Sequence, residues 1–131
     1  MDYKLIEFKV HGDENGKLIA VEGGIDSPFE IKCVYWIYDT LPEIERGKHS
    51  HKNLEQIIVA VSGSCEFVLD DGKTKETVIL DRPNLGLYIG KNIWRVMKNF
   101  SGECKLVVFA SDYYDEKEYI RNYDKFLEGV K

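Results

Sequence analysis

The sequence predicts an all-β fold, an antiparallel sandwich or barrel that ends in one short helix. Short runs of β-branched and aromatic residues recur along the 131-residue chain, and turn signals separate them at intervals of about ten residues. Asp71-Gly72 is the strongest hairpin signal, because a type I′ turn needs positive φ at both of its central positions. A helical pattern occurs only after Asp115. The chain length and the absence of a linker composition predict a single domain over residues 1–131.

Composition narrows the classes of partner. Hydrophobic residues make up 44% and charged residues 31% of the chain, as is usual for a globular protein. A formal net charge of −5 argues against general affinity for nucleic acid or for an anionic membrane. No apolar run approaches the roughly 18 residues of a membrane helix, and residues 1–4 show no signal-peptide pattern. The three cysteines are odd in number and widely spaced, which suits a reducing cytoplasm and matches no zinc-site spacing.

The part of the chain before residue 49 is expected to hold three strands. They are residues 3–10, 18–22 and 31–38, with turns at 11–16, 23–24 and 26–28 and a loop over 39–48. In the third of these strands, alternation places Cys33, Tyr35 and Ile37 on one face.

Six further strands are expected after residue 55, namely residues 56–61, 65–69, 77–80, 85–89, 94–98 and 105–110. The first of them is continuously apolar, which is typical of a strand buried on both faces.

The helix is predicted from Asp115, a suitable N-cap with Glu118 three residues later. One face of it would carry Tyr119, Tyr123, Phe126, Leu127 and Val130. We expect this face to pack on the barrel.

The candidate active site is a histidine pair. His49 and His51 are separated by one residue, so both imidazoles point to the same face of an extended strand. The apolar run that follows places the pair at the mouth of a buried strand. Arg46 before the pair, and Glu55, Gln56 and Gly63 after it, favour an active site over the alternative of a surface turn.

A β-barrel with His-x-His at a strand mouth resembles the cupin superfamily. His49, His51 and Gly63 fit the first cupin motif, but Gln56 stands where that motif has an acid. Glu55 is one residue early, which turns its side chain to the opposite face of a strand. Residues 90–99 align with the second motif, and Arg95 occupies its histidine position.

These departures bear on the metal that most cupins bind. The usual centre combines three imidazoles with one carboxylate, whereas this chain offers two imidazoles, an amide and a permanent cation. Arginine cannot ligate a metal and repels one. The sequence therefore predicts no bound metal and no cofactor.

Within the cupins, the chain resembles the sugar 3,4-ketoisomerases that act on dTDP-4-keto-6-deoxyglucose. The resemblance rests on Arg46-Gly47-x-His49-x-His51-Lys52, Gly63-Ser64-Cys65, Leu69-Asp70-Asp71-Gly72, the stretch 110–116 and Tyr119-Ile120-Arg121-x-Tyr123. It implies a metal-free jelly-roll homodimer that moves a ketone from C4 to C3 for a following aminotransferase, in dTDP-3-amino-3,6-dideoxyhexose biosynthesis. Family members commonly have Arg where this chain has Asn15, before Gly16, and often Arg at Cys33. The product configuration at C4, galacto or gluco, stays open.

The residues fit this chemistry. Moving the ketone requires removal of the C3 proton and return of a proton at C4 through an enediol, and histidine titrates close to working pH. Either His49 or His51 can be the base. Tyr35 matches the family tyrosine near the sugar and can donate to the oxyanion, although a packed core tyrosine is the alternative.

Substrate binding is expected from a wider set of residues. At least one of Arg46, Arg82 and Arg95 should contact the diphosphate, since guanidinium groups match phosphate oxygens; the alternative is surface charge. Asn15, Gly16, Cys33 and Gln56 complete the candidate substrate-binding set. Two other functions stay open, a dTDP-4-keto-sugar 3,5-epimerase and a non-catalytic nucleotide-sugar-binding cupin.

Overall fold

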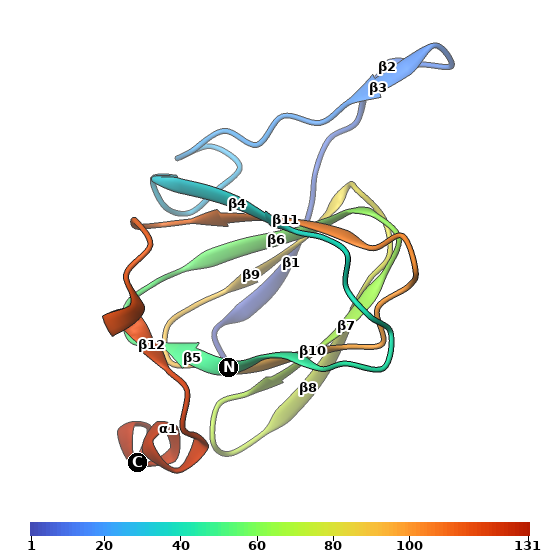
Figure 1. Cartoon of the computed structure of the whole chain (residues 1–131). Coiled ribbons are helices and arrows are strands. Elements are labelled where there is room, and N and C mark those ends of the chain that lie inside the picture. Colours follow the sequence, from blue (N-terminus) through green and yellow to red (C-terminus); the bar gives the residue numbers. More distant parts are fainter.

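The computed structural model describes residues 1–131, which form two facing five-stranded antiparallel sheets (Figure 1). The first sheet has the order β1 (Tyr3–Glu7), β9 (Leu85–Ile89), β6 (Gln56–Ser62), β11 (Lys105–Ala110) and β4 (Cys33–Ile37). The second has the order β12 (Tyr119–Ile120), β5 (Arg46–His51), β10 (Trp94–Lys98), β7 (Cys65–Asp70) and β8 (Lys75–Leu80). A small hairpin of β2 (His11–Asp13) and β3 (Gly16–Leu18) stands apart from both. The predicted all-β class is confirmed.

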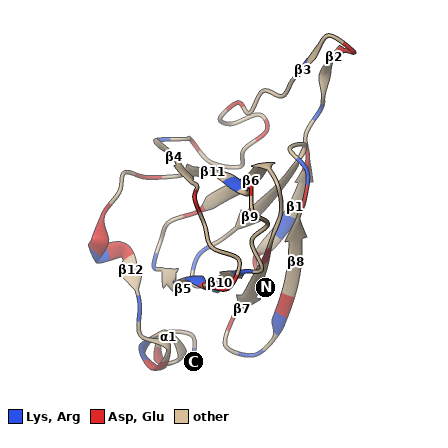
Figure 2. Cartoon of the chain, turned by 45° about the vertical axis from the view of Figure 1, so that its right-hand side comes forward, with Lys and Arg blue, Asp and Glu red and all other residues tan.

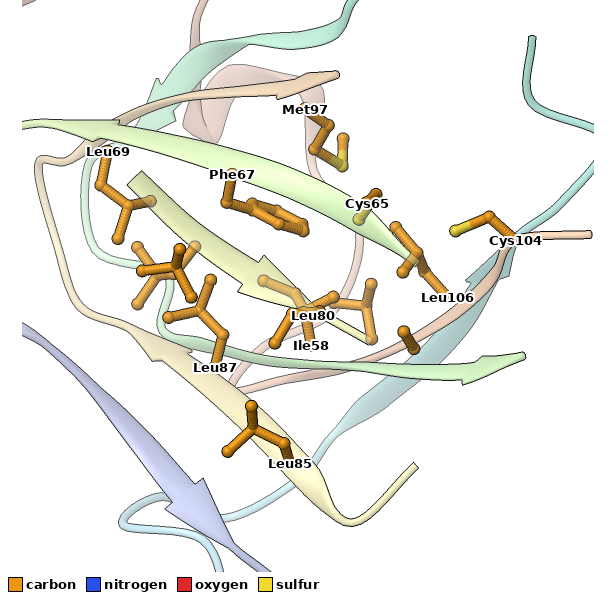
Figure 3. Packing of buried hydrophobic residues seen from close by; sticks show 14 of the residues in the cluster. Ile58, Cys65, Phe67, Leu69, Leu80, Leu85, Leu87, Met97, Cys104 and Leu106 are labelled. Atoms are coloured by element: carbon orange, nitrogen blue, oxygen red, sulfur yellow. The ribbon is translucent and has the colours of Figure 1, made fainter. Parts of the chain in front are cut away.

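The main core lies between the two sheets. It contains 16 buried residues, and Figure 3 shows Ile58, Leu87 and Leu106 of the first sheet facing Phe67 and Leu80 of the second. Burial of each such side chain contributes about 1.5–3 kcal/mol. This core joins the sheets into one unit around the site described below.

A second cluster covers the outer face of the first sheet. Phe8, Phe29 and Tyr88 pack there on Ile57 and Val59, which alternate along β6 with side chains that face the main core. β6 is therefore buried on both faces over residues 56–60, as its continuous apolar sequence predicts.

The N-terminal segment differs from prediction. Residues 11–18 form the β2–β3 hairpin, which projects from the barrel in both views (Figures 1 and 2), whereas a turn over 11–16 and a strand over 18–22 were expected. The strand prediction was wrong because residues 19–22 pair with no strand. Their apolar side chains are used differently: Ile19 and Val21 pack on the second cluster as a cover for the sheet.

The Asp71-Gly72 hairpin is confirmed, but its turn type is not. The last pair of the ladder is Asp70 with Lys75, so four residues form the loop instead of two. Within this loop only Gly72 has a positive φ, at 93°. The Asp71 carboxylate stabilises this longer loop, because its Oδ1 accepts hydrogen bonds from the backbone N–H groups of Lys73 and Thr74.

The predicted helix from Asp115 was wrong over its first half. Asp115 caps only a single 3₁₀ turn, η1 (Glu116–Glu118), and β12 follows it directly. β12 pairs with β5, and the Glu118 carboxylate accepts from two backbone N–H groups in the loop after β5. These tertiary hydrogen bonds outweigh the local helical pattern.

A short C-terminal helix does form, as α1 (Tyr123–Gly129). Its N-cap is Asn122, whose side chain accepts from the Lys125 N–H, and its buried Phe126 packs against Trp94. None of the helices has the length and apolar character that crossing a membrane requires.

Candidate active site

The histidine pair lies at one end of β5, between the two sheets. The imidazole centroids of His49 and His51 are 4.8 Å apart, so both rings enter one space, as their spacing predicts. β5 is irregular just before the pair, where the register to β10 shifts and Gly47 has φ of 83°. A Cβ at Gly47 would lie 3.1 Å from the carbonyl oxygen of Arg95, so glycine allows β5 and β10 to approach.

Both histidines are held neutral. Burial and the nearby Arg95 cation lower the pKa of His49 to about 4, and burial, Arg95 and His49 lower the pKa of His51 to about 2. His51 is 0% exposed, and neither of its ring nitrogens has a hydrogen-bond partner; Nδ1 of His49 also has none. Each ring therefore offers an unshared nitrogen lone pair at neutral pH, as a general base requires.

Tyr119 is a site residue that sequence reasoning missed. Its ring centroid lies 4.9 Å from that of His49 and 4.4 Å from that of His51. The Arg121 guanidinium lies over the Tyr119 ring, 4.5 Å from its centroid, and donates from Nε to Oε1 of Glu116 (2.7 Å). The β-favouring dipeptide Tyr119-Ile120 was the available signal, and the helical pattern around it hid that signal.

Three strands contribute a chain of buried hydrogen bonds next to the histidines. Arg95 on β10 donates from Nη1 to Oε1 of Gln56 on β6 (2.6 Å), and Nε2 of Gln56 donates to the Tyr35 hydroxyl on β4 (2.9 Å). A second guanidinium nitrogen donates to the carbonyl of Ile93 (3.0 Å). Burial raises the pKa of Tyr35 to about 12, so its phenol is protonated at neutral pH.

A cavity of about 530 Å³ opens beside His49. Tyr35, Arg46, Tyr119 and Arg121 line its other sides. This volume lies in the range of small-molecule sites. His51 is fully buried and does not line this cavity, so the two histidines differ in access from it.

The other predicted residues divide into two groups. Cys33 stands near the cavity, beside Tyr35 and Tyr119. Arg82 is exposed in the β8–β9 loop and pairs with Asp81, and Asn15 and Gly16 lie at the exposed tip of the β2–β3 hairpin. These three residues do not join the histidines within the chain.

A metal centre would need a different set of donors. No group of three or more His, Cys, Asp or Glu side chains is assembled in the chain. The oxygen of Gln56 accepts from Arg95, and Arg95 is itself a cation that faces the histidines.

Comparison with known proteins gives a consistent family. The chain matches, over residues 1–131, the protein family described as FdtA: WxcM-like, C-terminal. A TDP-4-oxo-6-deoxy-alpha-D-glucose-3,4-oxoisomerase of Aneurinibacillus thermoaerophilus is 49% identical over 130 residues, which are 99% of this chain and 94% of that protein.

Solved structures superpose on almost the whole chain. A 3,4-ketoisomerase from Helicobacter canadensis is 55% identical with a TM-score of 0.97, covering 99% of this chain and 98% of that one. A His-to-Asn mutant of a 3,4-ketoisomerase from Thermoanaerobacterium thermosaccharolyticum, in complex with TDP-4-keto-6-deoxyglucose, is 43% identical with a TM-score of 0.96, covering 98% and 94%. A 3′-monoepimerase from Streptomyces bikiniensis, 18% identical with a TM-score of 0.77 over 89% of this chain and 67% of that one, shares the fold alone.

Proposed function

This chain belongs to the FdtA family (WxcM-like, C-terminal), and from that premise we propose how its site acts on a dTDP-linked 4-keto-6-deoxyhexose. The chain is a 3,4-ketoisomerase of dTDP-4-keto-6-deoxyglucose, the TDP sugar of its relatives' names. The observation that carries the mechanism is the pair of adjacent, neutral imidazoles with unpartnered nitrogens.

The two histidines divide the proton transfers. The C4 ketone acidifies the proton on C3, and one imidazole removes it to leave an enediolate. A proton then returns to C4, and the oxygen on C3 gives up its proton and becomes the ketone. The number of atoms is unchanged and no external oxidant is needed. A neutral imidazole can remove the proton from C3, and the imidazolium so formed can return a proton at C4.

The enediolate oxygen needs a donor in the buried site. Tyr35 lines the cavity beside His49 and is protonated, which supports a role in stabilising this oxyanion. Tyr119, packed on both imidazoles, supports their orientation.

We assign diphosphate binding to Arg46, because it is the exposed arginine that lines the cavity and has no carboxylate partner. Arg121 also lines the cavity, but it is paired with Glu116. Cys33, beside Tyr35, is assigned to the sugar end of the site. The relative solved with TDP-4-keto-6-deoxyglucose supports this class of ligand.

A homodimer is proposed as the working state. Val34, Trp36, Tyr38 and Val61 form an exposed apolar surface on the first sheet, and isolated two-stranded hairpins such as β2–β3 are marginally stable. A two-fold contact would cover both features. Asn15, Gly16 and Arg82 lie away from the histidines of their own chain. In such a dimer they could contact the substrate bound by the other subunit.

Two further proposals concern the chain as a whole. We propose that residues 1–131 act as one domain, which is supported by a main core drawn from both sheets. A cytoplasmic location is supported by three free cysteines, of which Cys65 and Cys104 are buried.

The test is incubation with dTDP-4-keto-6-deoxyglucose followed by NMR of the product. We expect a 3-keto sugar, and the coupling of H4 will give the configuration at C4. A 4-keto sugar inverted at C3 or C5 would instead identify an epimerase, and an unchanged, tightly bound sugar would identify a binding protein. Turnover should persist after extended EDTA dialysis; loss of activity together with a stoichiometric transition metal would contradict the metal-free mechanism.

A further inference from the structure

Hydrogen bonds at both the oxygen and the nitrogen of the Gln56 side-chain amide determine its orientation. The Arg95 guanidinium has only donors, so the Gln56 atom 2.6 Å from it must be the acceptor Oε1. The Nε2 group, which is a donor only, then faces the Tyr35 hydroxyl at 2.9 Å. The phenol oxygen therefore accepts this bond, and its own hydrogen has to point elsewhere.

The free direction of the Tyr35 hydrogen leads toward the reacting groups. Tyr35 lines the cavity with His49 and Tyr119, while Gln56 and Arg95 are each 2% exposed and lie behind it. No second partner for the Tyr35 hydroxyl occurs among the side chains around it. A substrate oxygen in the cavity is thus the available acceptor.

We propose that Gln56 is a positioning residue: held by Arg95, it turns the Tyr35 O–H into the cavity to donate to the enediolate oxygen. This inference rests on the proposed function, and it gives Gln56 and Arg95 a role other than direct substrate contact. Neither side chain lines the 530 Å³ cavity.

The neutral amide also preserves the charge of Arg95. This guanidinium has no carboxylate partner, and its uncompensated charge bears on both histidines. The other groups that face the histidines are Tyr35 on β4, Tyr119 on β12, and Arg121 with its partner Glu116. A carboxylate at position 56 would pair with Arg95, whereas an amide bonds to it and leaves the charge in place.

The decisive variant is Gln56→Glu, which has the same shape. It keeps an acceptor for Arg95, but its second oxygen accepts from Tyr35 and draws the phenol hydrogen away from the cavity. At a pH of about 8.5, where histidines are neutral, we expect kcat to fall by about 10- to 100-fold. The dissociation constant for dTDP should stay within about threefold, because the variant does not alter a group that lines the cavity.

A double-mutant cycle separates positioning from a merely structural role. If Gln56 acts through the Tyr35 hydroxyl, Gln56→Glu should cost no more than about threefold in kcat when added to Tyr35→Phe. Losses that multiply in the double variant, or a Gln56→Glu variant with wild-type kcat, would overturn the proposal.

NMR of the histidine rings supplies a readout that needs no substrate. Because the new carboxylate offsets the Arg95 charge, the pKa of His49 should rise from its value of about 4. Asn84→Asp is the matched control, since it makes the same amide-to-acid change at a half-buried turn position between β8 and β9 and should leave the His49 signal unmoved. A His49 pKa that is the same in Gln56→Glu and in the wild type would contradict the role assigned to the neutral amide.

The outcomes also distinguish this inference from the proposed function. Wild-type protein that does not form a 3-keto sugar would refute the function, whereas an active wild type with an unaffected Gln56→Glu variant would refute only the inference. If Gln56→Glu does not fold, Gln56→Met removes the donor without adding charge. That variant should lose at least about fivefold in kcat with unchanged dTDP binding, and full activity would overturn the proposal.

Discussion

At the scale of single residues, burial decides the chemistry of the histidine pair. His51 has no exposed surface and His49 little, so both imidazoles are neutral where an exposed histidine would be partly charged. In the neutral form each ring keeps a nitrogen lone pair that can accept a proton, and the lowered pKa values also make the folded protein sensitive to acid.

Replacement of either histidine should impair catalysis more than binding. We expect His49→Asn and His51→Asn each to lose at least about 100-fold in kcat, because general acid–base groups contribute about 10²- to 10⁴-fold. Tyr35→Phe should lose less, since one hydrogen bond disappears and the ring remains. Steady-state kinetics with calorimetric titration of dTDP checks this, and near-normal turnover in both histidine variants would refute the assignment of the site.

Solvent deuterium should enter the product at C4. The proton taken from C3 rests on an imidazole N–H, which exchanges with water when the site is connected to solvent. Proton NMR of product made in D₂O should therefore show deuterium at C4 and none at C5. A fully protonated C4 is the contrary result. C3-deuterated substrate in H₂O then separates internal transfer, which retains the deuterium at C4, from exchange through the histidine pair, which loses it.

Stability should fall as the pH drops below about 6.5. The pKa of His51 is lowered from 6.5 to about 2 by folding, so the unfolded chain binds its proton first and the folded state loses free energy as pH falls. Between pH 7 and pH 5 this histidine costs about 2 kcal/mol of unfolding free energy. Urea unfolding at the two pH values measures the loss, and His51→Asn should reduce it; an equal pH dependence in both proteins would contradict the prediction.

At the scale of elements, the C-terminal tail completes the site by pairing as a strand. β12 lies beside β5 with Tyr119 opposite His51, and Glu118 joins the tail to the loop after β5 through two hydrogen bonds of 2.6 and 2.9 Å. The charged carboxylate makes this attachment stronger than a neutral one.

Loss of that carboxylate should loosen the tail. Glu118→Ala leaves the N–H groups of Asn53 and Leu54 without their acceptor, so we expect about 1–3 kcal/mol of destabilisation and faster hydrogen exchange at both amides. Activity should fall with it, because Tyr119 loses its fixed position against the histidines. Glu128→Ala, at an exposed position of α1, is the control. Unchanged exchange at residues 53 and 54 would show that Glu118 does not hold the tail.

At the scale of the whole molecule, the exposed apolar surface on the first sheet is the feature that supports an interface with a second copy of the chain. Val61 lies where two apolar grooves meet on this outer face, one beside Phe8 and one beside Trp36. Surface of this kind commonly marks a protein interface.

We expect a mass in solution of twice the 15.2 kDa of one chain. Val61→Asp should shift the mass toward that of one chain, because it places a charge in the apolar surface, whereas Ile79→Asp on the outer face of β8 should not. Multi-angle light scattering at micromolar concentration measures both. A wild-type mass of one chain would contradict the homodimer.

Local patterns were sufficient for most of the strands and for the histidine pair. The spacing of His49 and His51 alone brings both rings to one side of β5, and the apolar run at residues 56–61 alone indicates a strand covered on both faces. Asp115 also behaves as a cap, since its side chain accepts from a backbone N–H two residues later. Each of these features depends on residues that are close together in the chain.

Only the tertiary structure decided which distant residues share the site. Tyr119 contacts residues of β5 almost seventy positions earlier, and Tyr35, Gln56 and Arg95 meet from three strands. It also decided that residues 119–120 pair as a strand, although their local pattern is helical, and that Arg82 lies away from the histidines. For β12 and for the contacts of Tyr35, Gln56 and Arg95 the physical reason is the same. A hydrogen bond between segments far apart in the chain contributes more than a local preference of a few tenths of a kcal/mol, and its partner is not visible in the neighbouring sequence.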